Sequence, residues 1–206
     1  MAQLLQAWGP VSAAEIAEAL RLARQAIETG KDDPDALYMA ANTVSLFAGD
    51  HATAASAVDR ALALNPNSAH AWRASGYVLV RQNRPEPAIE AFERAMRLSP
   101  LDPLGFFFTA GIAAAHLAAG RYEEAVEWAD RASREFPRYE SSTRYKLIAL
   151  AHLGRIEEAR EWLARELELH PGLTVTGVKA VYAKAFAPEL LATFVEGYRK
   201  AGLPEE

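Results

Sequence analysis

Apolar residues recur along this chain at spacings of three and four, with glutamate and arginine between them. Ala88, Phe92 and Ala95 are one example. Residues at these spacings share one face of an α-helix. Valine, isoleucine and threonine never gather into the alternating runs that mark β-strands. The pattern therefore predicts an all-α protein.

A short phrase of sequence returns at a fixed distance. Residues 120–125 read Gly-Arg-Tyr-Glu-Glu-Ala, and residues 154–159, which lie 34 positions later, read Gly-Arg-Ile-Glu-Glu-Ala. In each of four segments an alanine is followed twelve residues later by a proline: the pairs are Ala54 and Pro66, Ala88 and Pro100, Ala125 and Pro137, and Ala159 and Pro171. A fixed period of this length predicts stacked helix pairs.

Three residues interrupt the period. The interval from Ala88 to Ala125 is 37 residues, whereas the other two intervals are 34. We place the insertion at Pro103 to Gly105 and expect it to lengthen the following helix, with Asp102 as its N-cap and Pro103 at its first position.

The residues at repeating positions have distinct physical roles. Gly76 lies inside a predicted helix, where glycine costs about 1 kcal/mol relative to alanine. We expect the second helix of the pair to cross there, with Ala88 as the matching small residue. Pro100 ends the second helix and sets the turn into the next pair.

These positions resemble the tetratricopeptide repeat. The resemblance implies a right-handed superhelical solenoid of antiparallel helix pairs that spans residues 1–206 as one domain. It predicts a partial repeat at 1–34, full repeats at 35–68, 69–102, 106–139 and 140–173, and a degraded capping pair at 174–206. In the partial repeat, Ser12 and Glu15 form a capping-box pattern that opens a helix expected to run to about Thr29 and stop at Gly30.

Several sequence segments of the repeats are also similar to those of one group of tetratricopeptide arrays. Residues 88–103, the phrase at 120–125, Leu153-Gly-Arg155 and the Gly202-Leu-Pro-Glu205 ending look like the tetratricopeptide region of bacterial class III adenylate or guanylate cyclases and of winged-helix regulators. In those proteins the array is a regulatory or interaction region. The resemblance implies a role in a larger bacterial signalling protein, whose catalytic or DNA-binding domain would precede this chain.

Composition and charge exclude several classes of protein. There is no cysteine, so disulfides and thiolate metal sites are ruled out, and the net charge is −5, which gives no general reason to expect nucleic acid. The most apolar stretch, residues 104–119, is shorter than a bilayer span, and the N-terminus lacks a signal-peptide pattern. We therefore expect a cytoplasmic chain with no membrane partner and no cofactor.

The first helices of such an array line a concave groove, and their sequence predicts its chemistry. The groove positions include three arginines and two histidines but no carboxylate. We therefore predict that the groove binds an extended, acidic segment of another protein. The predicted binding residues are His70, Arg73, Tyr77, Arg81, Phe107, Arg144 and His152. The alternative is that the arginines pair with acids from second helices or lie in water.

Phe106, Phe107 and Phe108 are consecutive, so they sweep about 200° around a helix and cannot all face one seam. We expect at least one to meet the groove, a neighbouring repeat or a partner, with burial under the preceding repeat as the alternative.

No catalytic or metal site is recognisable in the sequence. No two histidines have the i,i+4 spacing of metal ligands on a helix, and there is no phosphate-binding loop or nucleophile elbow. An interaction module is therefore predicted rather than an enzyme. The other hypothesis is a small-ligand sensor or enzyme accessory domain with a pocket around Tyr77, Phe107 and His152. Self-association through the N-terminal face is compatible with either.

Overall fold

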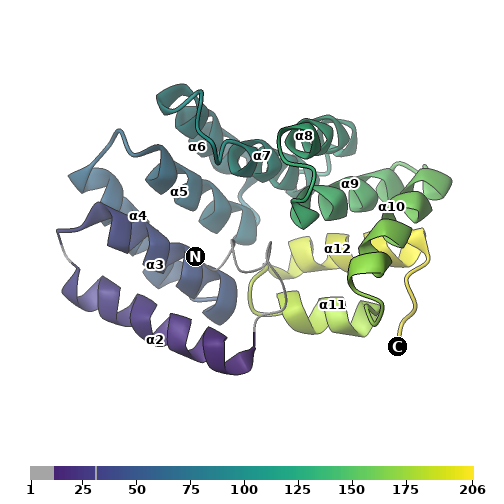
Figure 1. Cartoon of the computed structure of the whole chain (residues 1–206), viewed down its shortest axis with the longest axis horizontal. Helices are drawn as coiled ribbons and strands as arrows, with labels where there is room; N and C mark the ends of the chain where they lie inside the picture. The colour runs from purple at the N-terminus through teal and green to yellow at the C-terminus, as the bar shows by residue number, and fades with distance from the viewer. Residues whose placement is uncertain (1–11, 31) are drawn as a thin grey trace.

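The computed structural model describes residues 12–30 and 32–206, and all of the regular structure in those residues is helical. Four antiparallel helix pairs follow one another in an arc (Figure 1). The first helices of the pairs are α3 (Pro34–Ala48), α5 (Ala69–Arg81), α7 (Phe106–Ala118) and α9 (Glu140–His152). The second helices are α4 (His51–Leu64), α6 (Pro85–Leu98), α8 (Tyr122–Glu135) and α10 (Ile156–Leu169). The predicted fold class is confirmed.

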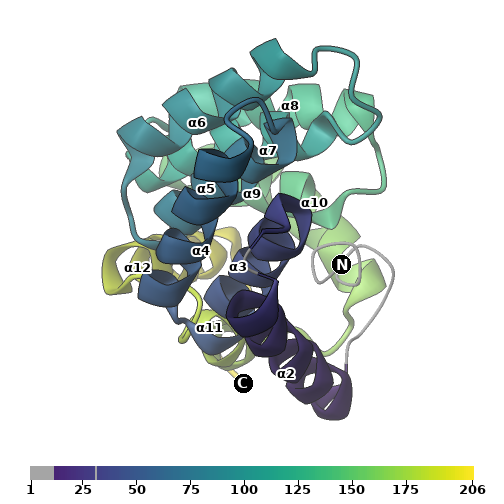
Figure 2. The ribbon, with the colours of Figure 1, turned by 90° about the vertical axis from the view of Figure 1, so that its left-hand side faces the viewer.

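A single helix precedes the four pairs. Helix α2 (Ala13–Thr29) packs along α3 (Figure 2). Ser12 and Glu15 form the expected capping box, and Gly30 is the C-cap. The sequence predicts that Met1 to Trp8 supply the short first half of this partial repeat, and these residues lie outside the described part of the chain. The apolar face of α2 is incompletely covered, since Ile16, Leu20 and Ile27 are only half-buried.

The backbone conformation explains why a glycine begins the repeated six-residue phrase. Each helix pair turns through a residue with positive φ that lies five positions before the small alanine of the second helix. These residues are Gly49, Asn83, Gly120 and Gly154, with φ values of 69°, 56°, 72° and 75°. Glycine and asparagine adopt this conformation at low cost, which is why the position repeats.

The small residues lie at helix crossings, as predicted. Gly76 is buried, and a Cβ atom placed on it would lie 2.7–2.8 Å from ring atoms of Phe92. Ala88, Ala125 and Ala159 are fully buried. Gly111 of α7, a position that the repeat pattern did not single out, approaches the same Phe92 ring from the other side, with its Cβ position 2.3 Å from Cζ. One aromatic ring therefore fits between two helices because neither carries a side chain there.

The insertion at 103–105 lengthens a loop and leaves the helix unchanged. Helix α7 begins at Phe106 and has 13 residues, as α5 and α9 do. The prediction that Asp102 caps a longer helix with Pro103 at its first position is wrong. Asp102 instead accepts a hydrogen bond from the backbone N–H of Leu104, and Gly105 is the N-cap. The Asp102 side chain gives a backbone N–H of the loop its hydrogen-bond partner, as in an Asx turn. The extra residues therefore need not become helical.

Two helices follow the last pair and depart from the regular stacking. The sequence predicts that the first helix of the capping pair runs from Thr174 to Phe186. Helix α11 (Val175–Tyr182) is shorter, and residues 183–186 form turns and a bend. Helix α12 (Pro188–Ala201) packs against α9 and also reaches α10 and α7. In Figure 1 the two helices lie inside the arc, between α10 and α3.

Helix α7 lies at the centre of the molecule, which accounts for its composition. Every residue from Phe106 to Ala118 is buried except His116 and Ala118. A helix that is apolar on all sides needs cover on all sides. Here α5, α6, α8, α9 and α12 provide it. In the residues that the structure describes, no helix is both long enough and apolar enough to cross a membrane.

Candidate functional site: the covered concave face

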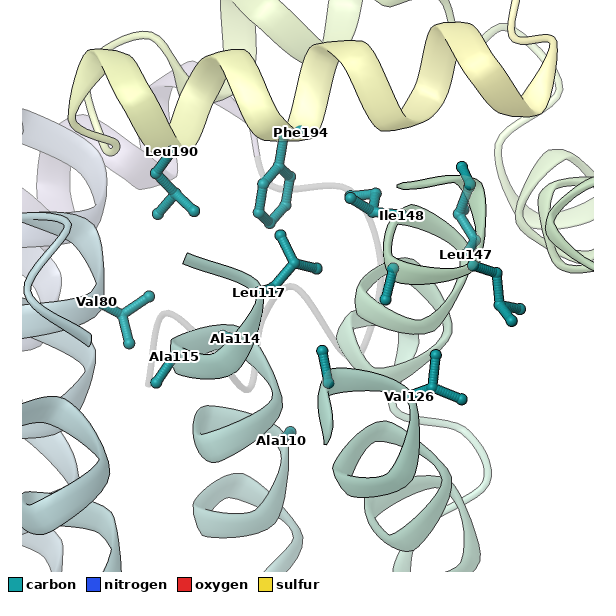
Figure 3. Close-up of a cluster of buried hydrophobic side chains, with 14 of the residues drawn as sticks. Val80, Ala110, Ala114, Ala115, Leu117, Val126, Leu147, Ile148, Leu190 and Phe194 are labelled. Carbon is teal, nitrogen blue, oxygen red and sulfur yellow. The ribbon is translucent and has the colours of Figure 1, made fainter. Parts of the chain in front are cut away.

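Helix α12 fills the hollow of the arc. Leu190 and Phe194 point from α12 toward Leu117 of α7 and Ile148 of α9, and all four side chains are buried (Figure 3). Gly197 allows the approach, because a Cβ atom there would lie 2.6 Å from Cγ2 of Ile148. The concave face of the third and fourth repeats is therefore occupied by the chain itself.

The segment between α11 and α12 reaches back to the first two repeats. The backbone N–H of Ala187 donates a hydrogen bond of 2.8 Å to the carbonyl of Arg81, at the end of α5. Ala185 packs with Leu46 of α3, and a Cβ atom on Gly49 would lie 2.1 Å from the carbonyl oxygen of Lys184. These contacts join the first repeat to the last and close the arc.

Arg144 contacts the C-terminal helices that cover the concave face. Its Nε atom lies 2.9 Å from Oε1 of Glu166 on α10, and the exposed fractions of the two side chains are 14% and 3%. Arg144 also donates to the hydroxyls of Tyr198 and Tyr182. Burial favours the neutral guanidinium, but Tyr182 and the Glu166 carboxylate outweigh it, so the pKa of Arg144 lies well above its ordinary value. For Arg144, pairing with an acid from a second helix, the alternative drawn from the sequence, is the one observed.

Arg81 is buried without such a partner. Its exposed fraction is 3%, and its Nη1 atom donates to Oδ1 of Asn42 at 3.0 Å and to Oγ of Ser45 at 3.3 Å. The guanidinium also lies 5.6 Å from the centre of the Tyr77 ring. Burial lowers the pKa of Arg81 to about 10, which leaves it charged at neutral pH. No carboxylate among the described residues pairs with it. The sequence predicts that both arginines line an open groove, but Arg81 is buried and the Arg144 side chain is only 14% exposed.

Tyrosines surround the two arginines. We call Arg81, Arg144, Tyr77, Tyr139, Tyr145 and Tyr182 the arginine–tyrosine cluster, because together they line one small cavity of about 30 Å³. Burial raises the pKa of Tyr77, Tyr145 and Tyr182, so their hydroxyls stay protonated and neutral. The Tyr77 hydroxyl donates to the carbonyl of Phe107. The cluster is a polar and positively charged centre in which Arg81, Tyr77 and Tyr139 are buried and the other three members are half-buried.

A larger cleft lies beside this cavity. The described residues enclose about 540 Å³ between the N-terminal helices and the last repeats. Leu46, Tyr139, Ser141, Arg144 and Tyr182 line both spaces. Apolar side chains from both ends of the chain contribute to the walls of the cleft, among them Ile16, Phe47 and Val181. The cleft therefore gives access from outside to the arginine–tyrosine cluster.

The remaining predicted groove residues are dispersed. Arg73 lies over the ring of Phe107, 5.1 Å from its centre, while Phe107 itself is buried. His70 is half-buried, and its Nε2 atom is 3.7 Å from Oδ2 of Asp102. His152 stacks on Tyr122 and lies 2.9 Å from the carbonyl of Thr193 on α12. Burial lowers the pKa of both histidines.

All three consecutive phenylalanines are buried, and they contact different neighbours. Phe106 stacks on Phe136, and Phe107 packs edge-on against Tyr139, on the side of the next repeat. Phe108 faces His70 in the preceding repeat. Phe136 and Tyr139 belong to the same repeat as the three phenylalanines, so Phe108 shows the alternative drawn from the sequence, burial against the preceding repeat.

Sequence reasoning missed the cover over the concave face, although one signal was present. The groove positions of the third repeat, Phe107, Ala110, Ala114 and Leu117, are all apolar, as is Ile148 in the fourth. An open, water-filled groove has no need for such a surface. In the part of the chain that the structure describes, no group of three or more histidine, aspartate or glutamate side chains is placed to hold a metal ion.

A sequence model of the tetratricopeptide repeat family matches residues 45–103 and 111–173, which together make up more than half of the chain. No curated protein matches the sequence.

Solved structures of other helical-repeat proteins are similar in fold. PilW, described as a widely conserved type IV pilus biogenesis factor, has a TM-score of 0.68 at 16% identity, covering 91% of this chain and 83% of its own. MamA from Desulfovibrio magneticus has a TM-score of 0.57 at 22% identity, with coverages of 76% and 86%. YrrB, described as having an unusual peptide-binding site, has a TM-score of 0.52 at 21% identity, with coverages of 86% and 91%.

Proposed function

Because the chain belongs to the tetratricopeptide repeat family, we propose that it is a protein-interaction module whose partner binds in the cleft of about 540 Å³. One observation carries the proposal: α12 covers the concave surface of α7 and α9, and the cleft is the hollow that remains beside it. Its volume lies within the range of ligand pockets, and its lining combines apolar walls with a few polar groups.

The lining favours an apolar segment that carries an acidic group. Glu140 and His170 pair with each other at 3.0 Å, and Glu166 is engaged by Arg144, so the two carboxylates of the lining have partners. Lys184 also lines the cleft and is exposed. Arg144 belongs both to the groove set predicted from the sequence and to this lining. Because Arg144 is itself paired with Glu166, Lys184 is the cation of the lining without a carboxylate partner among the described residues, and we retain the predicted acidic partner with Lys184 as its nearest unpaired charge.

The second hypothesis, a small-ligand pocket around Tyr77, Phe107 and His152, has less support. Tyr77 lines the small cavity, but Phe107 and His152 line neither space. A regulatory role within a larger signalling protein is the finer proposal that follows from the sequence resemblance. It is tested by reading the gene upstream of Met1: a cyclase or winged-helix domain in the same frame supports it, and an unrelated neighbour removes its basis.

A peptide-display selection followed by calorimetry tests the cleft. Val181 has an exposed fraction of 63% and lines the cleft, so Val181→Arg should block an apolar segment without unfolding the protein. Leu101→Arg is the matched control, because Leu101 is 92% exposed in the loop before α7. We expect the selected peptides to lose affinity for Val181→Arg and to bind Leu101→Arg as they bind the native chain. Equal binding to both variants would remove the cleft from the proposal.

A further inference from the structure

Arg81 carries a charge that this chain does not neutralise. The side chains within reach of its guanidinium are an amide, a hydroxyl and tyrosine rings, all of which are neutral at pH 7. The nearby His51 accepts or donates at Ser45 Oγ, 3.0 Å away, and burial lowers its pKa, so it contributes no negative charge either. The residues outside the described part, 1–11 and 31, contain no aspartate or glutamate.

A buried charge without a counter-charge is costly, by several kcal/mol. Other buried arginines in proteins are paired for this reason, and Arg144 shows the usual solution with Glu166. Arg81, on α5, lines the same small cavity as Arg144, on α9, but has no carboxylate partner among the described residues. An anion from outside the chain would supply the missing counter-charge.

The Arg81 guanidinium has hydrogen-bond donors without a partner among the described residues. Both hydrogen bonds of Arg81 to described residues come from Nη1, which leaves Nε and Nη2 without a hydrogen-bond partner among those residues. Tyr145 lines the same cavity, burial raises the pKa of its hydroxyl and keeps it protonated, and no hydrogen bond joins that hydroxyl to a described residue. Two guanidinium nitrogens and a phenol are donors suited to one compact anion.

The space limits the size of that anion. A single water-sized sphere needs about 10–15 Å³ of such volume. The cavity of about 30 Å³ has room for a small group, and a carboxylate group or a chloride ion is the smallest anion that fits this description. The anion would arrive through the adjoining cleft.

We propose that the cavity of the arginine–tyrosine cluster is a binding site for one compact monovalent anion, a carboxylate group or chloride, held by Nε and Nη2 of Arg81 and by the Tyr145 hydroxyl. This inference extends the proposed function, since a partner's acidic side chain or terminal carboxylate is one source of the group and a free anion is the other. The site itself does not depend on a partner.

Sodium formate and sodium chloride test the site on the full chain. The thermal unfolding midpoint is followed against each salt, with sodium methanesulfonate, whose anion is bulkier than formate or chloride, holding the ionic strength constant. We expect a saturable rise in the midpoint with formate or chloride, as for any ligand that binds only the folded state. No rise beyond that in methanesulfonate would overturn the site.

Arg81→Gln should weaken formate binding by about tenfold or more, since it removes the charge and the donors. Arg84→Gln is the control, because Arg84 is exposed at the start of α6, and its response should match the native chain. If Arg81→Gln does not fold, Tyr145→Phe removes one donor and keeps the ring, and its formate affinity should also fall. Formate affinity that is unchanged in whichever variant folds would contradict the proposal.

Competition identifies the source of the anion. Short peptides with a C-terminal aspartate or glutamate that displace formate indicate a partner's carboxylate, whereas formate binding that such peptides leave unchanged indicates a free anion. Either result supports the site. Formate binding together with failure of the Val181→Arg test would reject the partner and keep the anion site, so the two proposals can fail separately.

Discussion

Arg144 and Glu166 form a buried ion pair that fastens the inner face of the fourth repeat to its second helix and to α12. Their atoms Nε and Oε1 are 2.9 Å apart, and the Tyr198 hydroxyl of α12 lies 2.9 Å from both oxygens of the carboxylate. A residue that the sequence suggests is a solvated groove arginine is therefore part of the packing.

Removing one partner of this pair should be severe. Arg144→Met leaves the Glu166 carboxylate buried without a counter-charge, and we expect a loss of about 3–5 kcal/mol in the free energy of unfolding. Urea unfolding measures it. The double variant Arg144→Met with Glu166→Gln should recover much of the loss. Arg160→Met is the control, since the Arg160–Glu157 pair is exposed and contributes about 0–1 kcal/mol. A loss no larger than that of the control would show that the pair is solvated.

Gly76→Ala should destabilise the second repeat even though alanine is the better helix former. The new methyl group would lie 2.7 Å from the Phe92 ring, which Gly111 already confines on its other side. Overpacking of this kind costs about 1–3 kcal/mol, more than the helix propensity gained. Gly172→Ala serves as the control, because nothing lies within 4 Å of its Cβ position. Chemical denaturation that finds Gly76→Ala as stable as the native chain would contradict the crossing.

Gly49→Ala should loosen the contact between the first repeat and the C-terminal segment. Gly49 and Gly120 have nearly equal φ values, 69° and 72°, so alanine is strained equally at both. Only at Gly49 does the new Cβ meet another segment, at the Lys184 carbonyl, while the space at Gly120 is empty within 4 Å. Hydrogen exchange should therefore rise in residues 182–187 for Gly49→Ala and stay unchanged for Gly120→Ala. Equal exchange in the two variants would show that the closure does not depend on this approach.

Acidification should weaken the docking of α12. The ring of His152 contacts the Thr193 carbonyl and faces Lys200 and Glu196, and burial, with Lys200 adding to it, lowers its pKa. The unfolded chain then binds more protons below its ordinary histidine value of about 6.5, so stability falls as the pH drops through that value and below. His51, His70 and His116 shift in the same direction. Unfolding free energies of the native chain and of His152→Gln between about pH 7.5 and 5.5 test this. We expect a shallower pH dependence in the variant, and identical slopes would remove His152 from the effect.

The repeat architecture could be predicted because its causes are local. A residue with positive φ, a small alanine five positions later and a proline twelve beyond it recur within one 34-residue unit, so the sequence shows them directly. The capping box of Ser12 and Glu15 and the stop at Gly30 are local in the same sense. The position of the insertion before α7 could be predicted, but its conformation could not. An aspartate side chain can accept a hydrogen bond either as a helix N-cap or in an Asx turn, and Asp102 does the second.

The sequence by itself determined that this protein is a helical-repeat solenoid and that Gly76, Ala88, Ala125 and Ala159 are buried. Only the tertiary structure decided what covers the concave face. Phe194 meets Leu117 and Ile148 across large sequence separations, and no periodic signal records such a contact.

The same contacts decided the surroundings of the arginines. Arg144 donates to Tyr198 of α12 and pairs with Glu166, and the carbonyl of Arg81 accepts a hydrogen bond from Ala187, just before α12. The guanidinium of Arg81 is buried without a carboxylate partner among the described residues, which is why we propose that it binds an anion.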